Sequence, residues 1–284
     1  MKLLKKIGAG ILLALVIWAI VNPYLFTLAE DDYGSIQAFK NKGIELRFED
    51  FSFKQANLHI ARVGVLDKKV LLFVHGSPGS WVNAWDYMID TSWYTDYEII
   101  SIDRPGFGGS DYGQAKNLFE QAEIINQFVS QNLAERKVQL IGHSYGGPLV
   151  LQLCVDADSL YEKCIIMAGS VSPLAEKEEW QLNVFSKPLL NWMVPGSFEQ
   201  GIEELLWLKD DLKSPKYLNG IEKIKTPITG IYGTKDNMVP YQPNVDFLRK
   251  VFDTVQLTLH SIQDGNHFIP WDNYTEMKKI IRSN

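Results

Sequence analysis

Cysteine is scarce in this chain, which contains only Cys154 and Cys164 among its 284 residues. Two cysteines cannot build a disulfide framework, and no Cys and His spacing resembles a zinc site, so we expect no metal. Both are interpreted as small buried hydrophobic residues, and whether they pair stays open. Basic residues are also outnumbered, because 28 Lys and Arg against 34 Asp and Glu give a formal net charge of −6. This balance argues against a nucleic-acid partner held by phosphate neutralisation.

Charged residues are missing from most of the N-terminal segment as well. Three lysines (Lys2, Lys5 and Lys6) precede an uncharged run over residues 7–29, and the next charged residues are acidic. As a helix this run would be about 34 Å long, enough to cross the hydrocarbon core of a bilayer. Basic residues before the run and acidic residues after it predict a cytoplasmic N-terminus and a translocated remainder. We therefore expect residues 1–29 to direct the chain to a membrane.

Two interpretations of residues 1–29 remain open. A cleaved signal peptide fits the shorter apolar run 7–21 and the small residue Ala29, and would give a secreted or periplasmic protein. An uncleaved transmembrane anchor uses the whole uncharged run and would give a membrane-anchored protein with an extracytoplasmic domain. We favour the anchor because the run reaches spanning length. In both cases residues 30–284 form the folded domain, in which 25 basic residues face 34 acidic ones for a net charge of −9.

Short apolar runs recur along the remaining chain and are bounded by Gly, Pro or Asp. They predict strands over residues 70–74, 98–102, 138–141, 163–168, 228–232 and 255–259. Such continuous runs are typical of parallel strands covered on both faces, and helix-length segments lie between them, including 118–133 and 149–157. This alternation predicts an α/β fold with a mostly parallel twisted sheet and helices on both faces. The segment 44–65 alternates more in polarity and predicts an antiparallel edge.

The interval 171–223 interrupts the alternation of strands and helices. It lacks a strand signal, is divided by four prolines, and carries Trp180, Trp192 and Trp207 among helix-like patches. An insertion between two strands of such a sheet lies at the carboxyl edge, where ligands bind. We interpret it as a small helical lid, and simple covering of the core is the alternative for any one tryptophan.

Ser144 is the centre of a Gly-x-Ser-x-Gly pattern that lies between a predicted strand and a predicted helix. A serine on such a turn has a strained backbone, and flanking glycines leave the room that a Cβ would fill. The N-terminus of the following helix favours negative charge that develops there. Because a serine hydroxyl is a weak nucleophile, it needs a histidine base and an orienting carboxylate.

Both partners follow later in the chain, in the order Ser, Asp, His. Asp236 comes after the predicted strand 228–232 and His267 after the strand 255–259, so both are expected at the sheet edge where Ser144 lies. The competing acids are Asp246, Asp264 and Asp272. The other histidines, which belong to strand-like runs or to turns, are His59, His75, His143 and His260.

Five motifs in this order resemble those of the α/β-hydrolase superfamily over roughly residues 43–281. They are His75-Gly76-Ser77-Pro78-Gly79, Asp103-Arg104-Pro105-Gly106-Phe107-Gly108-Gly109-Ser110, the turn at Ser144, and the loops at Asp236 and His267. The resemblance implies the α/β-hydrolase fold, with Ser144 as the nucleophile, His267 as the base and Asp236 as the acid. It also implies that the backbone N–H groups of Ser77 and Tyr145 form the oxyanion hole. We expect Asp103 and Arg104 to fix their loop rather than to react, and His75 to brace the oxyanion loop.

These features predict a serine esterase or lipase-like hydrolase that acts through an acyl-enzyme intermediate, without a metal or organic cofactor. Dehalogenases and epoxide hydrolases of the superfamily use an aspartate at the position of Ser144, so this chain does not resemble them there. The tryptophan-bearing lid favours a small-molecule substrate with a hydrophobic acyl or alcohol group. One alternative is a non-catalytic binder of a hydrophobic ligand. Another is a prolyl aminopeptidase or amidase whose lid acids bind an amine, with the candidates Glu176, Glu178, Glu179, Glu203 and Glu204.

Overall fold

The computed structural model of this chain describes residues 31–175 and 196–283, together with residues 13, 14, 17, 18, 21 and 194. The predicted membrane segment at residues 1–29 and the first part of the predicted lid therefore lie almost wholly outside the described residues. Within the described part of the chain, no helix combines the length and the apolar character needed to cross a membrane.

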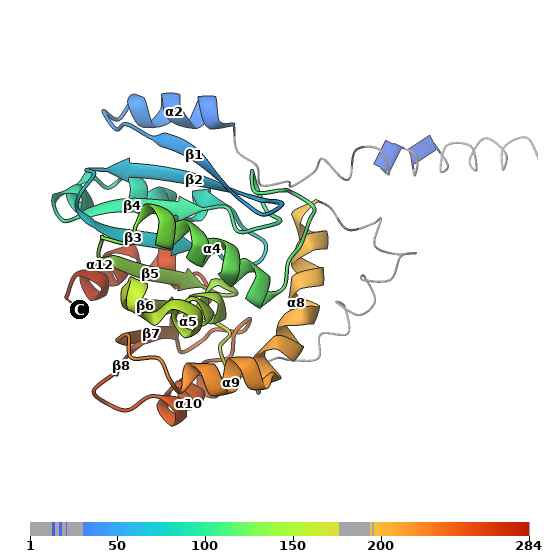
Figure 1. The fold of residues 1–284 in the computed structure, drawn as a ribbon, viewed down its shortest axis with the longest axis vertical. Coiled ribbons are helices and arrows are strands. Elements are labelled where there is room, and N and C mark those ends of the chain that lie inside the picture. Colours follow the sequence, from blue (N-terminus) through green and yellow to red (C-terminus); the bar gives the residue numbers. More distant parts are fainter. Residues whose placement is uncertain are drawn as a thin grey trace, which may run out of the picture.

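The described residues contain one sheet of eight strands in the order β1-β2-β4-β3-β5-β6-β7-β8 (Figure 1). The strands are β1 (Arg47–Phe53), β2 (Ala56–Gly64), β3 (Lys69–Val74), β4 (Tyr97–Ile102), β5 (Val138–His143), β6 (Tyr161–Met167), β7 (Ile228–Gly233) and β8 (Leu257–Ile262). β1 pairs antiparallel with β2, and β2 with β4, whereas the other neighbouring strands pair parallel. The mostly parallel α/β sheet predicted from the sequence is confirmed, and segment 44–65 forms its antiparallel edge.

The central strands are the most apolar because helices cover them on both faces. All six residues of β4 are buried, and in β3 only Lys69, the first residue, is exposed. Removing such runs from water stabilises the fold by about 25 cal/mol for each Å² of apolar surface buried. The buried central strands therefore fix the positions from which the loops at the carboxyl edge begin.

The last strand, β8, begins two residues later than the sequence predicts. The prediction starts at Val255, but the Asp253 carboxylate accepts hydrogen bonds from the N–H groups of Val255 and Gln256, both at 2.9 Å. These bonds hold the two residues in a turn, so β8 starts at Leu257. Local side-chain bonding of this kind competes with strand pairing and is not visible in apolar periodicity.

Helices pack on both faces of the sheet, as predicted. The α-helices are α2 (Asp32–Lys40), α3 (Trp85–Ile89), α4 (Leu118–Asn132), α5 (Gly146–Ala157), α8 (Ser197–Lys213), α9 (Pro215–Ile221), α10 (Tyr241–Val251), α11 (Ile269–Asp272) and α12 (Tyr274–Ser283), and the 3₁₀ helices are η2 (Trp81–Ala84), η3 (Thr91–Thr95) and η4 (Asp158–Leu160). α4 and α5 lie in front of the sheet in Figure 1, and α8, α9 and α10 join the same hydrophobic core cluster. α2, α3 and α12 pack in a second core cluster on the other face.

The described second half of the predicted lid is helical. α8 packs against the core through Leu208 and Leu212, which are fully buried. The same helix places Gly201 and Glu204 against the loops that follow β3 and β4. α8 therefore covers core and also lies at the carboxyl edge of the sheet. Its role as part of a lid stays a prediction.

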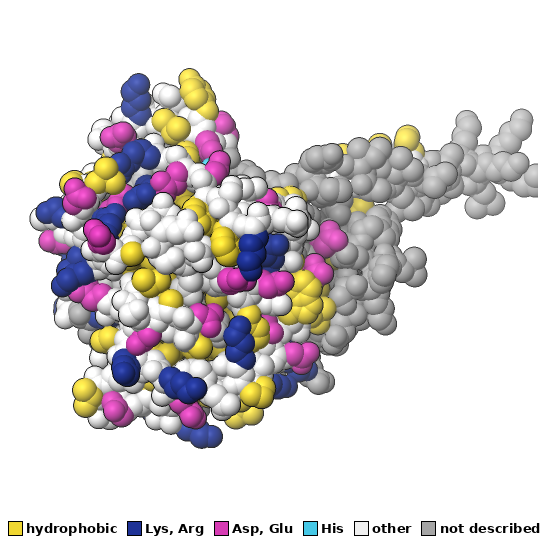
Figure 2. Space-filling model, in the orientation of Figure 1, with side chains coloured by type: hydrophobic (Ala, Val, Ile, Leu, Met, Phe, Trp, Pro, Cys, Tyr) yellow, Lys and Arg dark blue, Asp and Glu magenta, His cyan; other side chains and the backbone are white. Residues whose placement is uncertain are grey.

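The surface over α4 and α5 carries acidic and basic side chains that are interspersed rather than separated by sign (Figure 2). A protein that holds nucleic-acid phosphates gathers Lys and Arg on one face. Among the residues described on this side, no such continuous basic surface is present.

Candidate active site

Ser144 lies on the sharp turn between β5 and α5. Its φ is +54°, in the left-handed region that side-chain-bearing residues rarely adopt. The turn is too tight for side chains on its flanks, because a Cβ on Gly142 would lie 2.2 Å from the Gly146 oxygen and one on Gly146 would lie 2.2 Å from the Val74 oxygen. The side chain of Ser144 stays partly open to solvent. The strained strand-to-helix turn expected from the sequence is present.

Asp236 and His267 meet at the same edge of the sheet, on the loops after β7 and β8. Asp236 Oδ2 lies 2.8 Å from His267 Nδ1, and both side chains are buried. Because a carboxylate only accepts hydrogen bonds, Nδ1 carries the proton and Nε2 is left with a free lone pair. The second oxygen, Oδ1, accepts the N–H groups of Met238 at 2.9 Å and Val239 at 2.8 Å, which fixes the carboxylate.

The competing acids bond to other groups. Asp264 forms an exposed ion pair with Lys235 at 2.9 Å. Asp246 accepts from Gln242, and Asp272 accepts from Asn266. Of the four acids considered from the sequence, Asp236 is the one that the structure brings to His267.

His143, the residue before Ser144, connects the serine turn to the histidine loop. Its Nε2 lies 3.0 Å from the His267 carbonyl oxygen, and the two rings are 4.8 Å apart. Burial, followed by the neighbouring His267, lowers the pKa of His143 to about 3, so its ring is neutral and Nε2–H donates to that carbonyl. Sequence reasoning placed His143 in the turn but missed this link, because it joins residues 124 positions apart. Within the described residues, Ser144 and His267 are not joined by a hydrogen bond.

The loop after β3 lies directly against Ser144. A Cβ on Gly76 would be 2.9 Å from Ser144 Cβ, so only glycine allows this approach. The next N–H group along this loop belongs to Ser77, and the N–H of Tyr145 is at the start of α5. Neither N–H donates a hydrogen bond to any described residue. Two unpaired backbone donors beside a serine are what an oxyanion hole requires.

Asp103, the residue after β4, fixes the neighbouring loops. Its two oxygens accept the N–H groups of Trp81 at 2.6 Å and Gly109 at 2.7 Å. Burial raises the pKa of Asp103 to about 6, although these hydrogen bonds act in the opposite direction. Asp103 therefore joins the segment after the oxyanion loop to the loop after β4, the bracing role expected from the sequence.

The two cysteines are buried free thiols on α5 and β6. Burial raises the pKa of Cys154 well above its usual value, so the thiol is not ionised at neutral pH. No group of three or more His, Cys, Asp or Glu side chains in the described part of the chain could hold a metal ion.

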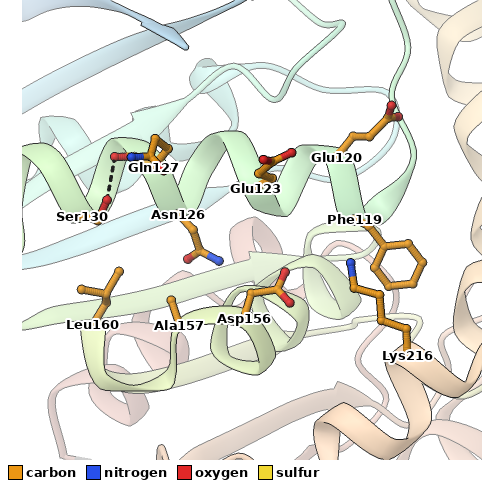
Figure 3. A pocket seen from close by; sticks show the side chains of 10 residues that line it. All are labelled: Phe119, Glu120, Glu123, Asn126, Gln127, Ser130, Asp156, Ala157, Leu160 and Lys216. Carbon is orange, nitrogen blue, oxygen red and sulfur yellow. Dashed lines mark hydrogen bonds between the residues drawn. The ribbon is translucent and has the colours of Figure 1, made fainter. Parts of the chain in front are cut away.

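A groove of about 610 Å³ lies between α4 and α5, away from Ser144 (Figure 3). Its polar lining includes Glu120, Glu123, Asp156 and Lys216, and none of the three candidate catalytic residues borders it. Figure 3 shows the three acids on α4 and α5 and Lys216 on α9, beside Phe119. We therefore place the candidate active site at the sheet edge and not in this groove.

Exposed apolar side chains border the edge that carries Ser144. Leu174 follows β6, Met238 follows the Asp236 turn, and Phe268 follows His267; their exposed fractions are 86%, 60% and 49%. Large exposed apolar side chains that follow Asp236 and His267 are candidates for contact with an apolar ligand.

Comparison with known proteins agrees with this geometry. Residues 69–200 match the family described as the alpha/beta hydrolase fold. A 2-hydroxy-6-oxononadienedioate/2-hydroxy-6-oxononatrienedioate hydrolase of Pseudomonas sp is 21% identical over 259 residues, which cover 79% of this chain and 90% of that one.

Solved structures resemble this fold over most of its length. A bacterial membrane phospholipase A superposes with a TM-score of 0.60 at 14% identity, covering 98% of both chains. A thermophilic esterase superposes with a TM-score of 0.60 at 18% identity, covering 84% of this chain and 96% of that one. At these identities the likeness concerns the fold. Together, the matched region, the relative and the sheet topology show that this chain has the α/β-hydrolase fold.

Proposed function

We propose that this protein is a serine hydrolase that cleaves carboxylic esters through an acyl-enzyme intermediate. The observation that carries the proposal is the 2.8 Å contact between Asp236 and His267 at the sheet edge where Ser144 occupies its strained turn. The two unpaired N–H groups of Ser77 and Tyr145 support it, because ester cleavage develops negative charge on the carbonyl oxygen.

The proposed reaction has two halves. Ser144 Oγ attacks the ester carbonyl while His267 Nε2 accepts the hydroxyl proton, and Asp236 stabilises the resulting imidazolium. The proton then passes from Nε2 to the departing alcohol, which leaves an acyl group on Ser144. Water attacks this ester with His267 again as the base, and the carboxylic acid is released. Proton transfer requires Ser144 Oγ to come within about 3.2 Å of Nε2 when substrate is bound.

We propose a substrate with a hydrophobic acyl or alcohol group. The exposed Leu174, Met238 and Phe268 border the reactive edge and would lose contact with water against such a group. Burying an apolar chain of this kind contributes about 0.8 kcal/mol per CH₂. Longer acyl chains should therefore bind more tightly until the apolar border is covered.

Membrane attachment through residues 1–29 belongs to the same proposal. Asp32, at the start of α2, lies 3.5 Å from His59 Nε2, and the His59 carbonyl accepts the N–H of Asp103, the first residue after β4. The start of α2, which follows the N-terminal segment in the chain, thus lies close to the carboxyl end of β4. An anchor at this point would keep the candidate active site near the bilayer, where hydrophobic esters concentrate. Cleavage of the same segment would release the domain instead.

The aminopeptidase alternative requires an acid that is free to bind an amine. Glu204 accepts a bidentate ion pair from Arg104 and is fully buried, so it is not free. Glu203 is exposed on α8, and the three remaining candidate acids lie outside the described residues.

The relatives named dienedioate hydrolases act on dicarboxylates, which a cationic side chain would hold. All six arginines of the chain lie in its described part. Arg47, Arg62 and Arg136 contact Glu98, Arg104 contacts Glu204, Arg249 contacts Asp246, and Arg282 contacts the Ser92 carbonyl. None of these arginines is left to hold a second carboxylate, which favours an uncharged ester over a dicarboxylate.

An ester series with acyl chains from acetyl to decanoyl tests the proposed function. Full-length wild type in detergent should hydrolyse p-nitrophenyl esters with a preference for chains longer than acetyl, and Ser144→Ala should lose this activity. Failure of wild type on every ester would refute the proposal. Turnover of proline-aminoacyl substrates in that case would favour the aminopeptidase, and tight ligand binding without hydrolysis would favour a binder.

A further inference from the structure

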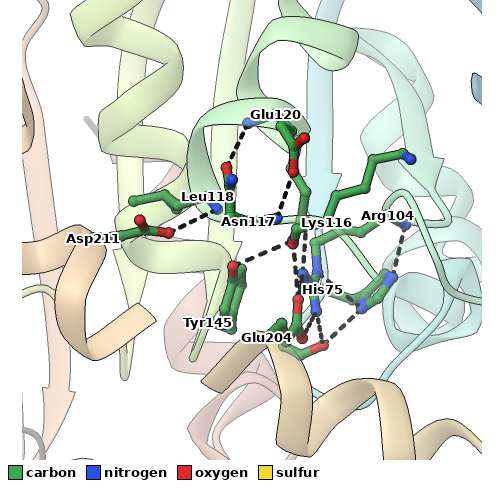
Figure 4. Close-up of polar contacts among 11 residues, drawn as sticks. His75, Arg104, Lys116, Asn117, Leu118, Glu120, Tyr145, Glu204 and Asp211 are labelled. Atoms are coloured by element: carbon green, nitrogen blue, oxygen red, sulfur yellow. Dashed lines mark hydrogen bonds and ion pairs between the residues drawn. The ribbon is translucent and has the colours of Figure 1, made fainter. Parts of the chain in front are cut away.

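We propose that Arg104 is a positioning residue that aims both oxyanion donors at Ser144, and that Glu204 of α8 holds Arg104 in place. The proposal rests on the proposed serine-hydrolase function and goes beyond the triad. Arg104 belongs to the loop after β4 and Glu204 to α8, one hundred positions later in the chain. Figure 4 shows both side chains converging beneath Tyr145 and beside His75.

The ion pair between these two residues is bidentate and closed to water. Arg104 Nη1 donates to Glu204 Oε2 and Nη2 donates to Oε1, both at 2.7 Å, and both side chains are fully buried. Removing one partner would leave an uncompensated charge in the interior. α8 is therefore fixed to the loop after β4 at this point.

The same guanidinium also holds the oxyanion loop. Arg104 Nη2 donates a further hydrogen bond to the Gly76 carbonyl oxygen at 3.0 Å, and His75 Nδ1 lies 2.7 Å from that oxygen. The C=O of Gly76 and the N–H of Ser77 belong to one planar trans peptide, in which they point in opposite directions. Fixing the oxygen therefore fixes the direction of the Ser77 N–H.

His75 contributes as a neutral ring. Its Nε2 accepts the backbone N–H of Arg104 at 2.9 Å, so Nδ1 carries the proton and donates to the Gly76 oxygen. Burial, and then the charge of Arg104, lower the pKa of His75 well below its usual value, which keeps this tautomer neutral. Two donors thus hold one carbonyl oxygen, and they polarise the peptide that carries the Ser77 N–H.

The second oxyanion donor is held by the ring of its own residue. The Arg104 guanidinium lies 4.3 Å from the centre of the Tyr145 ring, a cation–π contact. Gln121 links the same pair, because its Oε1 accepts from Arg104 Nη1 at 2.8 Å and its Nε2 donates to the Tyr145 hydroxyl at 3.2 Å. One buried cation therefore contacts the peptide that carries the Ser77 N–H and the side chain of Tyr145, whose own N–H is the second donor.

This arrangement makes a prediction about which kinetic constant changes. An oxyanion exists in the transition state and not in the bound ester, so misaimed donors lower kcat and leave KM nearly unchanged. Arg104→Lys keeps the charge but cannot span Glu204 and the Gly76 oxygen together. Its kcat should fall about 10- to 100-fold. The matched control is Arg62→Lys, which weakens a bidentate pair with Glu98 near the amino end of β4. In that pair Arg62 Nε lies 3.0 Å from Glu98 Oε1, and Arg62 Nη2 lies 3.1 Å from Glu98 Oε2.

The double variant Arg104→Met/Glu204→Leu separates folding from positioning. Replacing a buried ion pair by apolar side chains of similar size commonly preserves stability. The test measures kcat and KM with p-nitrophenyl butyrate, and the melting temperature, for each full-length protein in detergent. The double variant should keep a melting temperature near that of wild type while kcat stays at least tenfold low. Arg62→Lys should lose stability with kcat within twofold of wild type. A double variant with wild-type kcat, or an equal loss of kcat in Arg62→Lys, would overturn the proposal.

A measurement without turnover distinguishes failure of this proposal from failure of the proposed function. The amide proton shift of Ser77 reports the hydrogen bonding of its own peptide unit. It should move in Arg104→Lys and stay in place in Arg62→Lys, whether or not the protein cleaves esters. An unchanged Ser77 shift in Arg104→Lys refutes the positioning role, whereas a wild type that cleaves no ester refutes the proposed function alone.

Discussion

Asp236→Asn tests the triad through the tautomer of His267. In the native protein, Asp236 Oδ1 accepts the N–H groups of Met238 and Val239, and Oδ2 lies 2.8 Å from His267 Nδ1. An asparagine has one oxygen and one NH₂ group. The two backbone donors require the oxygen, so the NH₂ must face His267. Nδ1 then becomes the acceptor, and the proton moves to Nε2, where it blocks transfer from Ser144.

The expected loss in kcat is about 10⁴-fold, the magnitude found when the same tautomer is imposed on a serine protease. That factor corresponds to about 5 kcal/mol of transition-state stabilisation. The fold should survive, because the asparagine oxygen still accepts both backbone N–H groups. Steady-state hydrolysis of p-nitrophenyl butyrate and thermal unfolding, both on the full-length protein in detergent, measure the two effects.

Asp264→Asn is the matched control, since Asp264 lies in the loop of His267 and pairs with the exposed Lys235. Exposed pairs contribute about 0–1 kcal/mol, so its kcat should stay within twofold of wild type. A kcat above one tenth of wild type in Asp236→Asn, or an equal loss in Asp264→Asn, would rule out this role for Asp236.

Three further predictions concern packing, charge and pH. Gly201→Ala gains about 1 kcal/mol of helix propensity, so the fold should not lose stability. The new Cβ would lie 3.0 Å from Ser77 Oγ and push on the oxyanion loop, so kcat should fall about tenfold. An unchanged kcat would contradict the contact of α8 with that loop. Glu98→Gln removes the buried carboxylate that Arg47, Arg62 and Arg136 share, although Arg62 keeps its pair with Glu49. Urea unfolding should therefore show a loss of about 1–3 kcal/mol with kcat unchanged, and an unchanged free energy of unfolding would contradict this. Burial raises the pKa of Asp103 to about 6, so the folded state binds this proton more tightly than the unfolded chain does. As pH rises from 4 to 7, Asp103 alone should therefore lower the free energy of unfolding by about 2–3 kcal/mol. Asp103→Asn should remove that part of the pH dependence, and an identical pH profile would contradict the assignment.

The sheet could be predicted because its central strands coincide with continuous apolar runs of the sequence. The runs at 70–74 and 98–102 fall within the observed strands β3 and β4, and the run 255–259 is displaced only where the side chain of Asp253 holds a turn. The turn at Ser144 could be predicted as well, because Gly142 and Gly146, two positions before and after it, leave no room for a Cβ.

The bracing of the site was less accessible from sequence. Arg104 and Glu204 are one hundred positions apart, and neither lies in a pattern that indicates the other. The sequence suggested Glu204 as an amine-binding acid, because a charged residue on a helix says nothing of its burial. The contact between His143 and the His267 carbonyl could not be predicted either, because it depends on how two distant loops pack together. Side-chain contacts between distant loops leave no periodic signal.

The proposed function requires Ser144 to be an activated nucleophile. Full-length wild type and Ser144→Ala are treated with a fluorophosphonate, and the labelled peptide is located by mass spectrometry. We expect one adduct per chain on Ser144 in wild type and none in the variant. An unlabelled wild type, an adduct on another serine, or equal labelling of Ser144→Ala would contradict it.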